Sequence, residues 1–424
     1  MKTGSFYCKL YDSEIMPGKI ADSNLASKGR QSYEWAASRM GIIEKIRARN
    51  ESTQLLAGFR LGFCLHITKE TSVLAMAVKN LGADITICSA NPLSTQDDIA
   101  AFLYDKGVNV YAWRGETESE YQECILDVLA FKPVIVTDDG GDLHSMAHHQ
   151  EIKGIVGGTE ETTSGVKRLV ALEKAGRLLY PVIAVNNART KYLFDNRYGT
   201  GQSTLDGILR ATGILMAGKN VVVCGYGWVG KGVAARARGL GAIVIVTEVD
   251  PIKAIEAKMD GFQVMRLSDA APAGDIFVTC TGQRAVIRKE HFIKMKDAAI
   301  LANAGHFDIE IDIEDLYAIS HRPLQIKPHL ERFDFDGKRV FLLSKGRVVN
   351  LVAADGHPPE VMALSFANQL LSILYIAKNH DKMELRVHAV PEKLDEQVGR
   401  YTLDAMGIRI DKMTEEQKRY IHSS

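Results

Sequence analysis

Lys191 and Asp195 stand four residues apart in the stretch NNARTKYLFDN. A lysine in this position can act as a base toward a hydroxyl group, with the carboxylate orienting the lysine or the substrate. The alternative is an i,i+4 ion pair on a solvated helix face, which stabilises a helix by only a few tenths of a kcal/mol. Spacing alone favours the ion pair. The position of both residues just before a glycine motif typical of dinucleotide sites strengthens the catalytic interpretation.

Carboxylates and histidines gather at other points of the chain. The stretch DDGGD, residues 138–142, has three aspartates within five positions. One of them would have a raised pKa beside its neighbours and exchange protons with a histidine, although an Asp- and Gly-rich turn is the simpler interpretation. His66, His306 and His357 stand in polar or glycine-flanked positions. A lone histidine is usually structural, but three at expected strand ends or following loops indicate a site.

The stretch HSMAHH raises the question of a zinc site, because His144 and His148 share one face of a helix, with His149 beside them. Zinc peptidase helices carry H-E-x-x-H, and this stretch lacks that glutamate and has no nearby cysteine. We therefore predict that these histidines are structural and that the protein has no metal site.

A glycine motif in the middle of the chain predicts a dinucleotide site. Gly225, Gly227 and Gly230 form G-x-G-x-x-G between an expected strand and an expected helix. The first two glycines allow a tight turn and close approach of the backbone to pyrophosphate, and the third lets helix and strand pack closely. Glu248 ends the next expected strand, where a carboxylate accepts from the adenosine ribose hydroxyls and favours NAD over NADP. A glycine-rich turn without a ligand is the less favoured interpretation.

Alternating strands and helices would position these residues. FCLHIT, DITICS, VNVYAW and PVIVTDD read as strands separated by helices, and NVVVCGYG, AIVIVTEVD, GDIFVTCTG and AAILANAGHFD form a second such series. YEWAASRMGIIEKIRARN reads as one amphipathic helix, and a helical tail is expected from Pro359. Ligands of such sheets bind beyond the carboxyl ends of the strands, so His66, Thr68, Asp138 and Asp139 are expected there.

The fold class follows from this alternation. We predict an α/β protein with two Rossmann-like, doubly wound parallel-sheet domains and a small helical C-terminal segment. The polar and glycine-containing stretches near residues 187–200 suit a hinge between the domains.

Composition excludes several classes of function. The chain has 424 residues, with 52 Lys and Arg and 52 Asp and Glu, so no global charge favours nucleic acid. Its six cysteines are scattered without a C-x-x-C pair, which is typical of reduced thiols in a cytoplasmic protein. The N-terminus, MKTGSFYCKLYDSE, lacks an apolar signal core, and we expect no run long enough to span a membrane.

Several blocks in the correct order make the chain resemble the S-adenosylhomocysteine hydrolase family from about residue 30 to 421. They include CLHITKETSVL, ADITICSANPLSTQDDIAAFL, VYAWRGETESEY, DDGGDL, EETTSGV, KYLFDN, DGILRAT, GYGWVGKG, TEVDPIKA, NAGHFDIEID and GRVVNL followed by GHP. The resemblance implies NAD as a tightly held catalyst that oxidises the 3′-hydroxyl of the nucleoside. The C4′ hydrogen becomes acidic, homocysteine leaves from C5′, water adds, and the hydride returns to the sugar.

The resemblance also implies roles for individual residues. Lys191 and Asp195 would engage the 3′- and 2′-hydroxyls, with Lys191 assisting removal of the 3′-OH proton. His66 and Asp139 would handle proton transfer at C4′ and C5′. The implied catalytic set is His66, Asp139, Lys191, Asp195 and His306. The implied substrate-binding set is Thr68, Glu70, Thr71, Asp139, Glu161, Lys191, Asp195, His357, Met362 and Phe366, with Glu161 on the ribose hydroxyls and Glu70 accepting from the adenine 6-amino group. The cofactor set is Thr162, Thr163, Ser164, Asn196, Gly225, Gly227, Trp228, Val229, Gly230, Glu248, Lys253, Ala304, Gly305, His306 and Asn350.

The sequence departs from the family pattern in several places, three of which concern the cofactor. Trp228 replaces the usual aspartate inside the glycine loop, and Lys253 stands where an asparagine is usual near the adenosine ribose. The sequence ends at RYIHSS, without the C-terminal extension that in this family reaches the partner subunit's NAD. We therefore expect easier cofactor exchange. The pattern resembles the short forms of archaea and thermophilic bacteria.

The resemblance further implies a domain division and partners. Residues 1–188 and 353–390 would bind the substrate, residues 189–352 would bind NAD, and residues 391–424 would form a short C-terminal segment. We expect a cytoplasmic homotetramer acting on small molecules, with no nucleic acid and no membrane partner. The alternatives are a hydrolase of another thio-nucleoside such as S-inosylhomocysteine, a net NAD-dependent dehydrogenase, and a non-enzymatic NAD-binding regulator. Glu70 argues against the inosine compound, because a carboxylate accepts from an amino group and repels a carbonyl oxygen.

Overall fold

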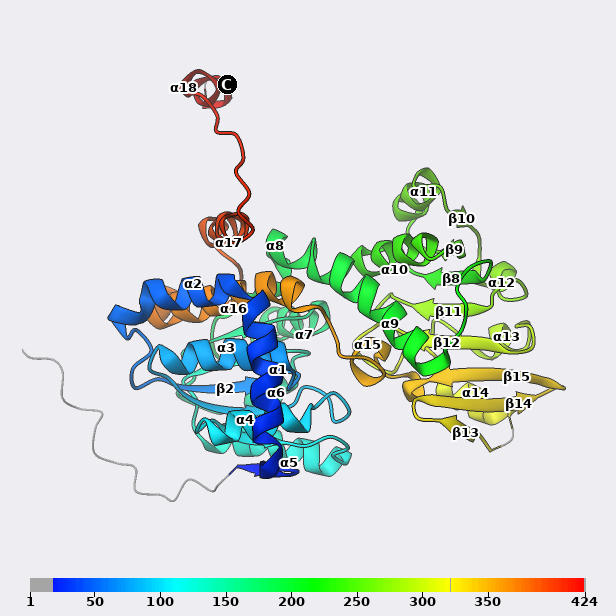
Figure 1. Ribbon diagram of the computed structural model, residues 1–424, viewed down its shortest axis with the longest axis horizontal. Coiled ribbons are helices and arrows are strands. Elements are labelled where there is room, and N and C mark those ends of the chain that lie inside the picture. The colour runs from blue at the N-terminus through cyan, green and yellow to red at the C-terminus, as the bar shows by residue number, and fades with distance from the viewer. Residues whose placement is uncertain (1–17, 321, 423–424) are drawn as a thin grey trace, which may run out of the picture.

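The computed structural model describes residues 18–320 and 322–422, which fold around two separate β-sheets lying side by side (Figure 1). The predicted lack of a signal core in the first 14 residues, and the prediction for Cys8, fall outside the described residues. Two sheets, each with helices on both faces, confirm the predicted fold class.

The first sheet is parallel throughout. Its strand order is β1 (Lys19–Ile20), β4 (Asn109–Ala112), β3 (Asp84–Cys88), β2 (Arg60–Cys64), β5 (Ile135–Asp138), β6 (Gly157–Glu160), β7 (Val182–Ala184) and β16 (Val387–Ala389). The connecting helices are α3 (Lys69–Asn80), α4 (Asp97–Asp105), α5 (Glu118–Ala130), α6 (Asp142–His149) and α7 (Thr163–Lys174). Leu61 and Phe63 pack in one apolar cluster and Cys64 in another. The strands are apolar on successive residues because both faces of the sheet are covered.

The helix predicted over residues 33–50 is two helices. α1 (Ala26–Arg39) and α2 (Gly41–Asn50) meet at Met40, whose φ of −108° and ψ of 38° are not helical. The apolar periodicity continues across this break because both helices pack on the first sheet's core, where Ala36, Met40 and Ile43 are buried. The apolar periodicity therefore gave no sign of the break, and Gly41 directly after Met40 was the one local signal for it.

The long helix α16 (Pro359–Asn379) is the core helix of the first sheet. It packs against α2, α3 and β6 and is followed by β16, which closes the edge of that sheet. The prediction that no run is long enough to span a membrane was wrong, since Pro359–Lys382 has the required length with a mean hydropathy of 1.4. However, 72% of that window is buried inside the protein, as in the core helix of a folded domain.

The second sheet has six parallel strands and an antiparallel edge. The strand order is β10 (Gln263–Val264), β9 (Ile243–Thr247), β8 (Asn220–Cys224), β11 (Ile276–Thr279), β12 (Ala299–Asn303), β15 (Lys338–Leu343), β14 (Leu330–Phe335) and β13 (Leu324–Lys327). Its helices are α10 (Trp228–Gly239), α11 (Pro251–Met259), α12 (Leu267–Ala270), α13 (Lys289–Phe292), α14 (Ile313–Ile319) and α15 (Val349–Val352). The antiparallel edge was not predicted.

The segment predicted as a polar hinge is mostly helical. It consists of a 3₁₀ turn (Val185–Asn187), α8 (Arg189–Tyr192), a π-helical turn (Asp195–Gly199) and α9 (Thr200–Thr212). The chain crosses back to the first sheet after α15. There α17 (Glu392–Ala405) packs on α2 and α8, whereas α18 (Glu415–His422) lies apart at the end of an extended segment (Figure 1). The domain boundaries themselves stay a prediction.

Candidate active site

A cavity of about 640 Å³ is lined by residues from both sheets. It lies beyond the carboxyl ends of β2, β5 and β6 in the first sheet and of β8, β11 and β12 in the second. The predicted site residues that line it are His66, Thr68, Glu70, Thr71, Asp139, Glu161, Thr162, Thr163, Ser164, Lys191, Asp195, Asn196, Gly227, Trp228, Val229, Ala304, Gly305, His306, Asn350, His357, Met362 and Phe366. Gly225, Gly230, Glu248 and Lys253 are not among the lining residues.

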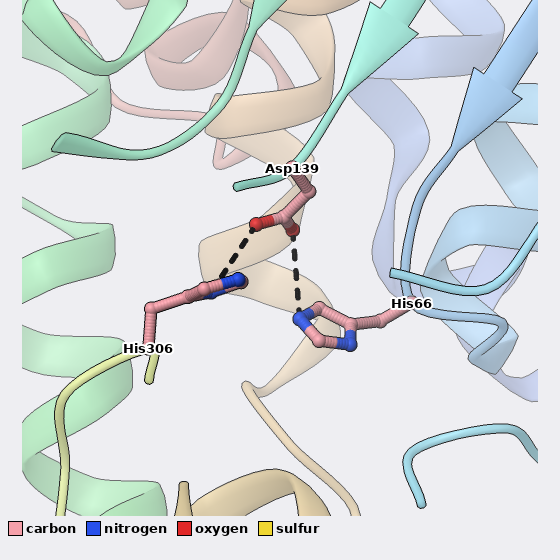
Figure 2. Close-up of side chains that lie close together, drawn as sticks. All are labelled: His66, Asp139 and His306. Carbon is pink, nitrogen blue, oxygen red and sulfur yellow. Dashed lines mark ion pairs between the residues drawn. The ribbon is translucent and has the colours of Figure 1, made fainter. Parts of the chain in front are cut away.

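His66, Asp139 and His306 converge on one point of the cavity from three elements (Figure 2). His66 Nε2 lies 3.8 Å from Asp139 Oδ2, and His306 Nδ1 lies 3.9 Å from Asp139 Oδ1. Ser94 donates to the Asn91 carbonyl, so His66 Nδ1 is the donor in its 2.7 Å bond to Ser94 Oγ. His66 Nε2 therefore presents a lone pair toward Asp139. We name these three residues the proton-transfer cluster.

Burial sets the protonation states of this cluster. It lowers the pKa of His66 to about 3, and the charge of His357 adds to this effect. Burial also lowers the pKa of His306, although the Asp139 carboxylate counters it. The pKa of Asp139 is raised by burial, against the opposing influence of His306 and Lys191. Neutral imidazoles beside a carboxyl of raised pKa form a set of groups able to donate and accept protons.

Two buried carboxyl groups fix the loop that carries Asp139 by accepting hydrogen bonds from its backbone. Asp138 and Glu160 are register partners at the ends of β5 and β6. Asp138 accepts from the backbone N–H of Asp139 at 2.9 Å and of His144 at 2.8 Å. Glu160 Oε1 accepts from the backbone N–H of Gly140 at 3.0 Å and of Thr162 at 2.8 Å. Because side chains alternate along a strand, this pair fixes the loops while Asp139 and Glu161 face the cavity.

His144 is structural, in agreement with the interpretation of HSMAHH. Its Nδ1 lies 3.0 Å from Tyr180 Oη, and its Nε2 lies 3.1 Å from the Thr159 carbonyl. Both ring nitrogens therefore have protein partners. Burial lowers the pKa of His144 to about 3.

Lys191, Asp195, Glu161 and His357 form a second, buried cluster in the same cavity, which we name the hydroxyl-binding cluster. Lys191 Nζ lies 2.7 Å from Asp195 Oδ2 and 3.6 Å from Glu161 Oε1. His357 Nδ1 donates to Asp195 Oδ1 at 2.6 Å. The i,i+4 ion pair considered from spacing does form, but only 4% of the Lys191 side chain is exposed. It is therefore no solvated surface pair.

Charge outweighs burial at Lys191 and Asp195. Burial alone would lower the pKa of Lys191, but the carboxylates of Asp195 and Glu161 raise it above its ordinary value. Burial would raise the pKa of Asp195, but Lys191 and His357 hold it below its ordinary range. Glu161 has a raised pKa because of burial, and Gln369 Nε2 donates to its Oε2 at 2.6 Å. Lys191 is thus an ammonium ion positioned by carboxyl groups.

The end of the cavity near α3 has one buried acid. Thr68 is the N-cap of α3, with its side chain accepting from the backbone N–H of Thr71. Glu70 is 1% exposed, and its Oε1 lies 3.1 Å from the ammonium of Lys69. Burial raises the pKa of Glu70, and Lys69 counters part of that rise. Phe366 and the half-buried Met362 of α16 line the cavity as apolar wall.

The three glycines of the β8–α10 loop meet three different constraints. Gly225 has a φ of +100°, a value that L side chains rarely adopt. A Cβ on Gly230 would lie 2.0 Å from the Gly225 carbonyl oxygen, so helix and strand could not pack. A Cβ on Gly227 would meet nothing within 4 Å, and it would face the cavity that Gly227 lines. Since α10 begins at Trp228 without a side-chain cap, its backbone N–H groups remain for an anion.

Further groups fit a dinucleotide. Asn350 is 2% exposed and lines the cavity. Its Nδ2 donates to Ser203 Oγ at 3.2 Å, whereas its Oδ1 has no hydrogen-bond partner among the described residues. Glu248 follows β9 and accepts from the backbone N–H of Tyr226 at 2.6 Å, so its carboxylate lies beside the glycine loop. These residues suit NAD, which needs donors for pyrophosphate and partners for ribose and carboxamide.

The two unusual residues of the cofactor set differ in position. Trp228 lines the cavity, with its ring centroid 5.5 Å from that of Tyr192 and the Lys231 ammonium 4.5 Å from its own. Lys253 is a half-exposed residue of α11, with its ammonium 3.5 Å from Asp250. Trp228 is therefore the one of the two that faces the cavity.

Sequence reasoning missed several lining residues: Leu65, Lys167, Arg168, Asn186, Thr200, Cys280, Thr281, Gly282, Phe307, Ile309, Glu310, Val348 and Leu351. Glu310 is 1% exposed, and burial raises its pKa. It accepts from the backbone N–H of Thr281 at 2.8 Å and of Gly282 at 2.9 Å, and so fixes the loop after β11. An acid within a strand-like run, IEID, would have been the only signal for it.

Sequence comparisons with known proteins find relatives of one enzyme family. A profile described as S-adenosyl-L-homocysteine hydrolase matches residues 18–153, and one described as the NAD-binding domain of that enzyme matches residues 196–356. An adenosylhomocysteinase of Sulfurisphaera tokodaii is 54% identical, over 96% of this chain and 98% of its own length. One of Sulfolobus acidocaldarius is also 54% identical, with the same coverage. An S-inosyl-L-homocysteine hydrolase of Methanocaldococcus jannaschii is 52% identical, over 95% of this chain and 98% of its own.

Proposed function

Because the chain belongs to the S-adenosyl-L-homocysteine hydrolase family and carries its NAD-binding domain, we propose that it hydrolyses S-adenosyl-L-homocysteine reversibly to adenosine and L-homocysteine. The observation that carries the proposal is that one cavity holds both the hydroxyl-binding cluster and the proton-transfer cluster, beside the glycine loop. A hydrolase that only activated water at a thioether would have no use for a buried lysine among carboxyl groups.

The chemistry requires the sugar to be activated before the thioether breaks. A thiolate is a poor leaving group from a saturated carbon. A ketone at C3′ makes the C4′ hydrogen acidic, so that the thiolate leaves by β-elimination. NAD bound beside Gly227 and Asn350 would supply the oxidising capacity for the 3′-hydroxyl. The hydride taken from the sugar would return to it at the end of the cycle. The residues of the chain bind the sugar and move its protons.

The hydroxyl-binding cluster holds the sugar at C2′ and C3′. Lys191 is an ammonium ion with Asp195 and Glu161 on either side. In this state it stabilises negative charge on the 3′-oxygen while the hydroxyl proton passes to a neighbouring carboxyl group. Glu161, with its raised pKa, is the better acceptor of the two, because the pKa of Asp195 is held low.

The proton-transfer cluster acts at C4′ and C5′. His66 Nε2 presents a lone pair and its pKa is about 3, so His66 remains neutral at physiological pH. Asp139 lies between His66 and His306 and has a raised pKa. These three groups can take the C4′ proton, protonate the departing thiolate, and deprotonate the water that adds to C5′. The same groups serve the reverse direction.

Thiol release provides the first test. The purified protein with NAD⁺ and S-adenosylhomocysteine should release one homocysteine thiol per adenosine formed, with no net accumulation of NADH. NADH that accumulates in proportion to turnover would instead indicate a dehydrogenase. Thiol release at an undiminished rate after complete removal of the dinucleotide would contradict the mechanism.

Replacement of Lys191 tests the hydroxyl-binding cluster. The Lys191→Met variant should lose about 100-fold or more in kcat, because one positioned acid–base or electrostatic group contributes about 10²–10⁴-fold. Exposed Lys174 on α7 lies outside the cavity and provides the control, Lys174→Met, which should retain wild-type turnover. Wild-type turnover in Lys191→Met would show that the Lys191 ammonium does not stabilise charge on the 3′-oxygen.

A second candidate substrate is S-inosylhomocysteine, since a relative at 52% identity bears that activity in its name. The base-recognition step separates the two compounds, because adenine offers a 6-amino donor and hypoxanthine a 6-oxo acceptor. Glu70 presents an acceptor at the α3 end of the cavity, which favours adenine, although the neighbouring Lys69 ammonium lies only 3.1 Å from it.

Replacement of Glu70 tests this preference. The wild-type protein should have the higher kcat/KM for S-adenosylhomocysteine. The Glu70→Gln variant should lower the ratio of kcat/KM for S-adenosylhomocysteine to kcat/KM for S-inosylhomocysteine by about tenfold or more, because an amide both donates and accepts. A ratio that the variant leaves unchanged would exclude Glu70 as the residue that reads the base.

We further propose a cytoplasmic homotetramer. Apolar side chains on one face of α11 support contacts between subunits, since Ile252, Ile255 and Met259 are 76%, 55% and 82% exposed. The cysteines of the described residues are free thiols, which suits a reducing compartment. Light scattering should give a mass four times that of the chain.

A further inference from the structure

Three groups of residues line the cavity. Glu70 and Phe366 line one region, the hydroxyl-binding cluster lies beside the proton-transfer cluster, and Arg168 and Phe307 lie beyond His306. The Arg168 guanidinium carbon is 4.7 Å from the centre of the Phe307 ring, whose centroid is 4.6 Å from that of His306. Arg168 thus lies next to the proton-transfer cluster, which the proposed function places at C4′ and C5′ of the nucleoside.

Arg168 is held in place while part of its guanidinium remains available. Its Nη1 donates to Asp142 Oδ1 at 2.6 Å and to the Gly140 carbonyl at 3.3 Å. Asp142 is fixed in turn by the Tyr121 hydroxyl, which donates to its Oδ2 at 2.9 Å. Both hydrogen bonds of Arg168 to residues 18–320 and 322–422 use Nη1, so Nε and Nη2 can donate to a ligand. About 40% of the Arg168 side chain is exposed.

The other basic side chains that line the cavity are less suited to an anion at this position. Lys191 is surrounded by Asp195, Glu161 and Asn196. Lys167 is exposed, and its charge acts on Glu310 of the second sheet. Among the lysines and arginines that line the cavity in the described chain, Arg168 alone contacts the Asp139 loop and Phe307.

We propose that Arg168 binds the α-carboxylate of the amino-acid part of the substrate. This inference rests on the proposed function, which places homocysteine on C5′. A planar guanidinium with two free donors matches a carboxylate, and such charge-assisted bonds are among the stronger hydrogen bonds of proteins. The pair of Asp142 and Tyr121 positions the guanidinium, and Phe307 supports it through a cation–π contact. Arg168 would thereby select thioethers of α-amino acids over other 5′-thioethers.

The experiment compares two substrates in three proteins. The substrates are S-adenosylhomocysteine and its decarboxylated analogue, which keeps the thioether and the amino group. The proteins are the wild type, Arg168→Met and a matched control, Arg177→Met, in which an exposed arginine just after α7 is replaced. Thiol release gives kcat and KM for each combination.

We expect Arg168→Met to lower kcat/KM for S-adenosylhomocysteine by about 10- to 100-fold, mainly through KM. The same variant should change kcat/KM for the decarboxylated analogue less than threefold, and Arg177→Met should change neither. Arg168→Lys should recover part of the loss, because it restores the charge without the planar pair of donors. Each of these results supports the proposal.

Equal losses for both substrates in Arg168→Met would overturn it, because they would show that Arg168 only supports the Asp139 loop. An unchanged KM for S-adenosylhomocysteine would also overturn it. These outcomes differ from failure of the proposed function, in which the wild type itself would release no thiol from S-adenosylhomocysteine.

Discussion

At the scale of single residues, buried histidines link the stability of the protein to pH. His66 and His144 each have a pKa lowered to about 3 by burial, compared with an ordinary value of 6.5. Below pH 6.5 the unfolded chain binds more protons at these positions than the folded protein does. Stability is therefore lost as the pH falls from 6.5 toward 3, at about 1.4 kcal/mol per pH unit for each histidine.

His144 allows this linkage to be measured apart from catalysis. Between pH 7 and pH 5, the free energy of unfolding of the His144→Gln variant should fall by about 2 kcal/mol less than that of the wild type. Urea unfolding at the two pH values measures this difference. The exposed His149 on the same helix provides the control, and His149→Gln should keep the wild-type pH dependence. An identical pH dependence in His144→Gln and wild type would contradict the argument.

Candidate catalytic residues were predictable where they stand within a recognisable sequence motif. The residue types of Lys191, Asp195, His66 and His306 suggested a site, and the structure places all four in one cavity. Burial could not be read from spacing, so the i,i+4 interpretation of Lys191 and Asp195 stayed open until their exposure was known. Arg168 gave no signal, because its significance depends on Phe307, which is far away in the chain.

At the scale of elements, the glycines of the β8–α10 loop differ in what requires them, the fold or the ligand. Gly230 lies against the Gly225 carbonyl, and Gly225 has a positive φ, so both are required by the fold itself. Gly227 has neither constraint, because its φ is −74° and no atom lies near its missing Cβ. A side chain at residue 227 would therefore clash with no part of the protein and would lie at the cavity that Gly227 lines.

Two substitutions test this division. The Gly227→Ala variant should unfold within about 1 kcal/mol of the wild type in the absence of dinucleotide, yet bind NAD at least tenfold more weakly by calorimetry. Gly230→Ala should lose about 2 kcal/mol or more in the same unfolding experiment, since helix and strand must separate. Wild-type NAD affinity in Gly227→Ala would show that the pyrophosphate lies elsewhere.

Regular elements were predictable and short ones were not. The strands β2, β3, β4 and β5, and β8, β9, β11 and β12, were found as apolar runs because both faces of each sheet are covered. β1, β10 and β16 have two or three residues each, too few for a pattern, and exist only through pairing with a longer neighbour. The break at Met40 escaped detection because neither a proline nor a change of periodicity marks it.

At the scale of the whole molecule, the two sheets meet through a very close contact. A Cβ on Gly140, whose φ is +119°, would lie 2.4 Å from His306 Nε2. Gly140 belongs to the first sheet's Asp139 loop, and His306 follows β12 of the second sheet. The absence of a side chain at residue 140 therefore determines how closely the two parts of the active site approach.

Gly140→Ala should lower kcat by about tenfold or more, because His306 would have to move away from Asp139. The variant Gly154→Ala provides a matched control, since Gly154 also has a positive φ, of +94°, but no atom within 4 Å of a Cβ. It should share the backbone strain, of about 1–2 kcal/mol, without the loss of turnover. Equal turnover in the two variants would show that the contact with His306 does not matter.

The return of the chain to its first sheet affects how the protein is made. A ribosome synthesises the strands from β1 to β7, then the entire second sheet, and only afterwards α16 and β16. The second sheet is contiguous and can close during translation, whereas the first keeps an open apolar face until α16 emerges. The half that begins first is therefore completed last, and a nascent chain interrupted before residue 359 would leave that face to chaperones or proteases.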